Sequence, residues 1–152
     1  MGDKNQMRIL GLDLGSHTVG MAISDELGLT AQPLRTLRRK SMGDDLREIS
    51  SVIARLDIYK IVIGLPKNMD GTLGKQAEIV FRWIKALKEE IHVPVVTWDE
   101  RLSTVEASRV LLEADLSRRK RKGAIDRLAA VLILQGYLDR AGKQTDGPTL
   151  PT

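Results

Sequence analysis

Residues 8–24 read RILGLDLGSHTVGMAIS, and this stretch decides the fold. Arg8–Asp13 is short and apolar, which predicts a strand, and Thr18–Ser24 predicts a second one. Because the connection between them is tight, the two strands should pair antiparallel. A third strand is expected near Ala31–Leu37. The chain therefore opens with an antiparallel sheet of three strands.

The rest of the chain alternates helices with apolar strands. Apolar residues recur at helical spacing in some segments and form short continuous runs in others. The expected elements, in order, are a helix over Asp44–Leu56, a strand over Ile61–Leu65, a helix over Lys75–Glu90, a strand over Val93–Trp98, and helices over Thr104–Ala114 and Ala124–Arg140. Such units need parallel strands covered by helices. The pattern predicts an α/β fold with one mixed five-stranded sheet and helices on both faces. Residues 7–141 should form one domain, with residues 1–6 and 142–152 as flexible termini.

Composition excludes several kinds of site. The 152 residues include no cysteine, which rules out a disulfide scaffold, a thiolate zinc site and a cysteine nucleophile. His17 and His92 are the two histidines, too few for a histidine-rich metal site. A metal would therefore sit on carboxylates, which favours Mg²⁺ or Mn²⁺. The polar start of the chain and the lack of an apolar run of about 20 residues predict a soluble, cytoplasmic protein without a membrane partner.

The net charge of +4 comes from one basic run. Its members are Arg118, Arg119, Lys120, Arg121 and Lys122, and without them 19 basic and 20 acidic residues remain. The run is expected to separate the last two helices. Such a run is either a solvated loop or an electrostatic footprint for nucleic acid, and composition alone leaves both readings open.

Three carboxylates stand at the ends of expected elements. Asp13 ends the first strand, Glu100 follows the last strand with Asp99 beside it, and Asp126 falls in the first turn of the last helix. If they converge, they would repel one another unless a divalent cation neutralised them, as in metal-assisted phosphodiester hydrolysis. Singly, each has an ordinary explanation: a turn for Asp13, an ion pair with Arg101 or a helix cap for Glu100, and the helix dipole for Asp126.

The loop Gly64–Lys75 joins a buried strand to a helix and is a candidate for contacts with phosphate. Backbone N–H groups at a helix N-terminus favour anions, and side chains of the loop would add contacts from Lys67, Asn68, Thr72 and Lys75. Arg101 is a further candidate. The alternative is an ordinary connecting loop, since Met-Asp-Gly-Thr is good turn chemistry. With only 3% aromatic residues, contacts to phosphate and to shape should dominate over base stacking.

Four ordered blocks resemble the YqgF family, also called RuvX or the Holliday junction resolvase-like family, of the ribonuclease H-like superfamily. The likeness spans about residues 7–140. Its blocks are Gly11–Gly15 with Gly20–Asp25, Val62–Pro66 with Asn68–Gly71, Asp99–Ala107, and Lys122–Asp126 with Ala129–Gln135. One departure is His17-Thr18, where the family commonly has basic residues. Other contacts to phosphate would then be needed, from Arg118–Lys122 or, failing that, from the regions Lys67–Lys75 and Arg35–Lys40.

The resemblance implies a ribonuclease H-like fold with strand order 3-2-1-4-5 and strand 2 antiparallel. It implies that Asp13, Glu100 and Asp126 form an active site holding Mg²⁺ or Mn²⁺, with Asp99 as a reserve ligand. The implied activity is nuclease processing of the 5′ end of precursor 16S ribosomal RNA, by a monomer or a homodimer. The alternatives are a Holliday junction resolvase acting on branched DNA and a non-catalytic module that binds RNA or takes part in transcription.

Overall fold

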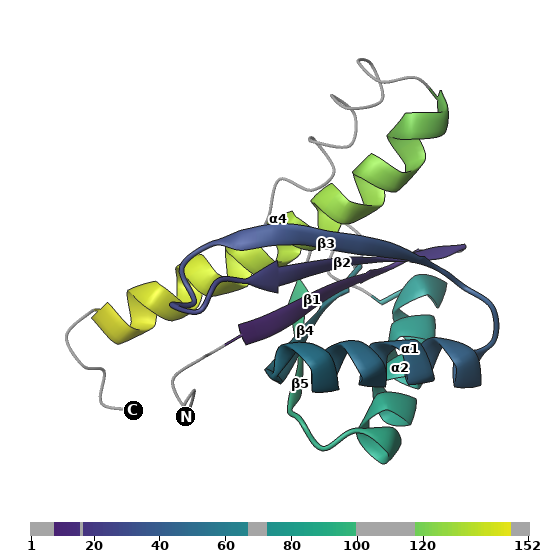
Figure 1. Cartoon of the computed structure of the whole chain (residues 1–152), viewed down its shortest axis with the longest axis horizontal. Helices are drawn as coiled ribbons and strands as arrows, with labels where there is room; N and C mark the ends of the chain where they lie inside the picture. The colour runs from purple at the N-terminus through teal and green to yellow at the C-terminus, as the bar shows by residue number, and fades with distance from the viewer. Residues whose placement is uncertain (1–7, 16, 67–72, 100–117, 147–152) are drawn as a thin grey trace.

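The computed structural model describes residues 8–15, 17–66, 73–99 and 118–146, with side chains of the last range described from 127 to 141. Its elements are labelled in Figure 1. They are β1 (Arg8–Leu14), β2 (Thr18–Ser24), β3 (Ala31–Arg38), α1 (Met42–Leu56), β4 (Ile58–Leu65), α2 (Lys75–Glu90), β5 (Val95–Asp99) and α4 (Arg118–Asp146). The helix expected over Thr104–Ala114 lies outside the described residues.

The strands form one five-stranded sheet in the order β3-β2-β1-β4-β5. β2 pairs antiparallel with β1 and with β3, whereas β4 pairs parallel with β1 and with β5. The predicted mixed sheet and its strand order are confirmed. Because β1, β4 and β5 run the same way, their carboxyl ends lie along one edge of the sheet, which we call the carboxyl edge.

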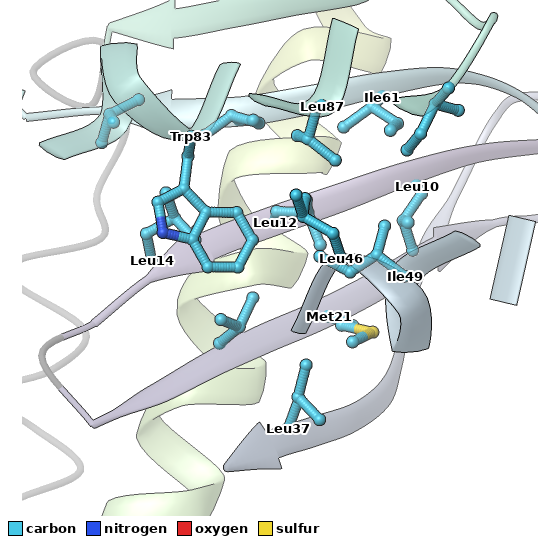
Figure 2. Close-up of a cluster of buried hydrophobic side chains, with 14 of the residues drawn as sticks. Leu10, Leu12, Leu14, Met21, Leu37, Leu46, Ile49, Ile61, Trp83 and Leu87 are labelled. Atoms are coloured by element: carbon cyan, nitrogen blue, oxygen red, sulfur yellow. The ribbon is translucent and has the colours of Figure 1, made fainter. Parts of the chain in front are cut away.

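Helices cover the sheet on both sides, as expected (Figure 1). One core lies between the sheet and helices α1 and α2, and Figure 2 shows Trp83 of α2 among leucines of β1. The other core lies under α4 and includes Val62, Trp98 and Leu134. Consecutive residues of a strand point to opposite faces, so Leu10, Leu12 and Leu14 of β1 belong to the first core and Ile9 to the second. No helix in the described ranges is both long and apolar enough to span a membrane.

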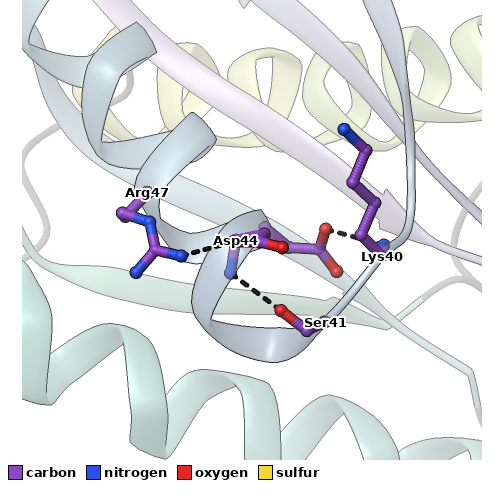
Figure 3. A network of polar contacts seen from close by, with 5 residues as sticks. Lys40, Ser41, Asp44 and Arg47 are labelled. Atoms are coloured by element: carbon purple, nitrogen blue, oxygen red, sulfur yellow. Dashed lines mark hydrogen bonds and ion pairs between the residues drawn. The ribbon is translucent and has the colours of Figure 1, made fainter.

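Local chemistry shifts some boundaries from their expected places. α1 begins at Met42, before the predicted Asp44, because the Ser41 hydroxyl accepts a hydrogen bond from Asp44 N at 3.1 Å and caps the helix (Figure 3). Asp57 then ends α1 in the left-handed conformation at φ 53°, and β4 starts at once at Ile58.

The last helix corrects two expectations. α4 begins at Arg118, so the backbone of the basic run is helical rather than a loop between helices. Arginine and lysine are good helix formers, and the single Gly123 costs only about 1 kcal/mol relative to alanine. Asp126 is therefore inside the helix and not in its first turn. α4 also continues to Asp146, past the predicted end at Arg140.

Candidate active site

Asp13 lies next to the carboxyl end of β1, the central strand of the sheet. Its neighbours Leu12 and Leu14 belong to the core under α1 and α2, so Asp13 faces the side that α4 covers. Only 6% of its surface is exposed. Its partner across the sheet is Gly20, which has no side chain to fill the space beside the carboxylate. A carboxylate supplies the oxygen ligands that a hard cation prefers.

α4 crosses this face antiparallel to β1. Near the start of β1, the Lys60 Nζ of β4 donates a hydrogen bond of 2.8 Å to the Tyr137 hydroxyl, which raises the pKa of Lys60. Further along β1, a Cβ on Gly11 would lie 2.8 Å from Leu134 Cβ and 3.2 Å from the Ala130 carbonyl oxygen. Positions nearer the carboxyl end of β1 therefore lie under positions nearer the N-terminus of α4.

This crossing predicts which turn of α4 meets Asp13. Asp13 is two residues beyond Gly11, or about 6.7 Å along the strand. Four residues of helix rise about 6 Å, so one turn before Ala130 brings the backbone of residue 126 level with Asp13. The side chain of Asp126 lies outside the described residues, and its contact with Asp13 stays a prediction.

β5 brings Asp99 to the same edge of the sheet but to the other face. Asp99 is the last residue of β5 and pairs in register with Leu65 of β4. The preceding Trp98 packs under α4, where its indole lies 3.0 Å from where a Cβ on Gly136 would be. Asp99 therefore faces away from α4 and from Asp13. Glu100 lies outside the described residues.

The structure describes only part of the predicted metal site of Asp13, Glu100 and Asp126. Within the ranges that the structure describes, no group of three or more histidine, aspartate or glutamate side chains is placed to hold a metal ion. Of the three predicted ligands, only Asp13 has a described side chain. Asp13, Glu100 and Asp126 as a metal site remain a prediction, supported by the path of α4 over β1.

Most of the predicted contacts to nucleic acid also fall outside the described residues. These are Lys67, Asn68, Thr72 and Arg101, together with the side chains of Arg118, Arg119, Lys120, Arg121 and Lys122. Lys75 is described: it is exposed and is the first residue of α2. Because α2 follows β4, Lys75 lies on the side of the molecule that holds the carboxyl edge.

Comparison with known proteins identifies the family. The model of the RuvX family, described as "Holliday junction resolvase", matches residues 7–140. The chain belongs to the RuvX family. A RuvX-like relative from Clostridium botulinum (strain Hall), called "Putative pre-16S rRNA nuclease", is 55% identical over 137 residues, which cover 90% of this chain and 100% of the relative. A protein of the same name from Desulforamulus reducens is 50% identical with the same coverage.

Solved structures agree with the RuvX assignment at the level of the fold. RuvC of Thermus thermophilus, in complex with a Holliday junction substrate, has a TM-score of 0.56 at 16% identity and covers 90% of this chain and 96% of its own. The yeast mitochondrial Holliday junction resolvase has a TM-score of 0.50 at 12% identity, with 88% and 78% covered. The resemblance drawn from the four sequence blocks, and the ribonuclease H-like sheet that it implied, are confirmed.

Two contacts in the RuvX fold were not anticipated from the sequence. Gln135 of α4 accepts a hydrogen bond from Ala31 N and donates one to the Leu29 carbonyl, both at 2.9 Å, which ties α4 to the start of β3. Arg39, just after β3, donates to the Gly15 carbonyl at 2.7 Å. In the sequence, the basic stretch Arg35–Lys40 pointed to Arg39. The spacing of residues along the chain does not reveal which carbonyl group its side chain reaches.

Proposed function

We propose that this protein is a divalent-metal-dependent nuclease that processes the 5′ end of pre-16S ribosomal RNA in the cytoplasm. The observation that carries the proposal is the buried carboxylate of Asp13, near the carboxyl end of β1 and on the face that α4 crosses. Membership of RuvX supports it, as do relatives called "Putative pre-16S rRNA nuclease" that the chain matches over their whole length. One domain, residues 7–141, would carry the whole activity.

The metal ions would be held by Asp13, Glu100 and Asp126, with Mg²⁺ or Mn²⁺ as the ion. Bound in pairs, such ions activate water and stabilise the leaving oxygen of the phosphodiester. The protein's own part is to hold the carboxylates ionised and oriented at one edge of a rigid sheet. Asp99 is the weaker candidate ligand, because it faces away from α4.

The substrate would be held mainly through its phosphates. The proposed contacts are Lys67, Asn68, Thr72, Lys75 and Arg101 near the carboxyl edge, and Arg118, Arg119, Lys120, Arg121 and Lys122 on the first turns of α4. Because the backbone of the basic run is helical, its five positions are distributed around the helix axis rather than along one extended segment. Only some of them can therefore face one nucleic-acid backbone.

Two substrates test this function against its nearest rival. Purified protein with Mn²⁺ or Mg²⁺ is incubated with an RNA that carries the 5′ leader of 16S ribosomal RNA, and separately with a four-way DNA junction. The proposal expects a defined cut in the RNA and little or no cutting of the junction. Cutting of the junction with the RNA left intact would contradict it.

A junction resolvase is the second candidate, favoured by the fold likeness to RuvC in complex with a Holliday junction. It would use the same carboxylates but would cut as a dimer, since a junction offers two equivalent strands. A non-catalytic binding module, the candidate from another class, would bind either substrate and cut neither. The same two incubations separate all three functions.

A further inference from the structure

The chain turns at the end of β3 through three basic residues, Arg38, Arg39 and Lys40, which we call the basic turn. We infer that the basic turn binds the phosphate backbone of the nucleic acid beside Asp13. This inference rests on the proposed function, because it names where that substrate is held. It adds a binding surface on the antiparallel side of the sheet, at the end of β3.

The basic turn lies at the same edge of the sheet as Asp13. β3 runs parallel to β1, since both pair antiparallel with β2. Arg38 pairs with Thr18 at the start of β2, and its neighbour Leu37 belongs to the core under α1 and α2. Arg38 therefore projects from the face that carries Asp13.

The register also gives the spacing between Arg38 and the candidate active site. Asp13, Gly20 and Thr36 form one row across β1, β2 and β3, and Arg38 lies two residues beyond Thr36. Two strand spacings of about 4.8 Å and two residues of about 3.3 Å put Arg38 roughly 12 Å from Asp13. Along the axis of a B-form duplex, at about 3.4 Å per base pair, this distance corresponds to three to four base pairs.

Arg39 fixes the basic turn in place. Its Nη1 donates to the Gly15 carbonyl at 2.7 Å, and its backbone N–H donates to the His17 carbonyl at 2.9 Å. Its guanidinium also lies over the indole of Trp83 at 5.5 Å from the ring centre. The turn is thereby joined both to the β1–β2 connection that follows Asp13 and to α2. A surface fixed before binding loses less conformational entropy when the ligand arrives.

The charges of Arg38 and Lys40 are available for a ligand. Both side chains are exposed, and neither forms an ion pair with any residue in the described ranges. The nearby acids already have partners. Asp44 pairs with Arg47 (Figure 3). Glu48 pairs with Arg35 at 2.7 Å, and Asp45 accepts a hydrogen bond from Lys40 N at 3.0 Å. The basic turn is thus an unbalanced positive surface, complementary to phosphate.

The test compares two double variants of the full-length protein with equal changes in charge. Arg38→Gln with Lys40→Gln removes the free charges of the basic turn. Arg55→Gln with Lys88→Gln, in the last turns of α1 and α2, removes two exposed charges at the opposite edge of the sheet. Binding to a fluorescent four-way DNA junction and to the 16S leader RNA is measured in EDTA, which prevents metal-dependent cutting, over a series of salt concentrations.

We expect the basic-turn variant to flatten the plot of log affinity against log salt by about 0.9 per lost duplex phosphate contact, or about 0.7 on a single strand. The control should keep the slope of the unmodified protein. Equal slopes for the two double variants, or no binding by the unmodified protein, would overturn the inference. Separate incubations with Mn²⁺ test the proposed function. A flattened slope without any cutting of either substrate would support binding by the basic turn but contradict the proposed nuclease activity.

Discussion

Gly11 is where the sheet and α4 approach most tightly among the glycines whose surroundings are described. A Cβ there would lie 2.8 Å from Leu134 Cβ, closer than real Cβ atoms come, and the Ala130 carbonyl leaves no room to turn away. Gly11→Ala should therefore push α4 off β1 and lower the free energy of unfolding by about 1–3 kcal/mol. Because α4 also carries Asp126, cleavage should fall further than the loss of folded protein explains.

Gly43→Ala is the matched control for that change, measured by the same urea unfolding and cleavage assays. Gly43 lies in the first turn of α1, and a Cβ there would meet only Arg47 Nη1 at 3.8 Å. Alanine should leave stability unchanged or raise it by up to about 1 kcal/mol. If Gly11→Ala behaved like Gly43→Ala, the close approach of α4 to β1 would be wrong.

Asp25, in the connection between β2 and β3, makes the stability of the folded protein depend on pH. Its carboxylate accepts hydrogen bonds from Leu29 N at 2.8 Å, Thr30 N at 3.3 Å and the Thr30 hydroxyl at 3.2 Å, and the bond from Leu29 does most to lower its pKa. A lowered pKa in the folded state means that the stabilisation is present above the ordinary carboxyl pKa and is lost as pH falls through the folded value.

The melting temperature should therefore respond to Asp25→Asn in a pH-dependent way. At pH 7 the variant should melt below the unmodified protein. The gap should begin to narrow below about pH 4, the ordinary carboxyl pKa, and should close as pH falls through the lower pKa of Asp25 in the folded state. Glu89→Gln, at an exposed site in the last turn of α2, controls for the general loss of one acid. A gap for Asp25→Asn that is constant from pH 7 to pH 3 would contradict the assigned hydrogen bonds.

At the scale of the elements, α4 depends on contacts that join it to distant strands. Gln135 bonds to Ala31 N and the Leu29 carbonyl across the sheet, and also to Asp139 on its own helix at 2.9 Å. Gln135→Leu should leave the Ala31 N–H without its acceptor and cost about 1–3 kcal/mol. Amide hydrogen exchange should show faster exchange at Ala31. Gln76→Leu, at an exposed site in α2, should leave that amide unchanged.

The elements also show what the sequence can and cannot determine. Apolar runs and helical periodicity correctly predicted β1, β2 and α2, because those signals come from residues near in sequence. The basic run was wrongly read as a loop, since like charges suggested a solvated segment while intrinsic helix propensity favours α4. The contacts of Arg39 and Gln135 could not be predicted from the sequence, because each joins residues far apart in the chain. Asp13 was identified from its motif, but its burial needed the structure.

At the scale of the whole molecule, the sheet order sets where a site can form. β1 is central and is flanked by parallel β4 and antiparallel β2, so the carboxyl edge is reached from both sides. The end of β4 and the start of α2 lie on one side, and the basic turn after β3 lies on the other. Asp13 lies between them, so a nucleic acid held by both would pass its backbone over that carboxylate.

The most direct measurement of the central claim is cleavage of the 16S leader RNA in Mn²⁺ by Asp13→Asn, with its melting temperature measured in EDTA. Asp57→Asn is the control, because asparagine tolerates the left-handed conformation at that exposed helix end. We predict that the unmodified protein and the control cut the RNA. We predict that Asp13→Asn does not, while melting at the same temperature or higher, since removing one of three clustered acids relieves repulsion. Cutting by Asp13→Asn, or a melting temperature well below that of the unmodified protein, would show that Asp13 is structural and contradict the account.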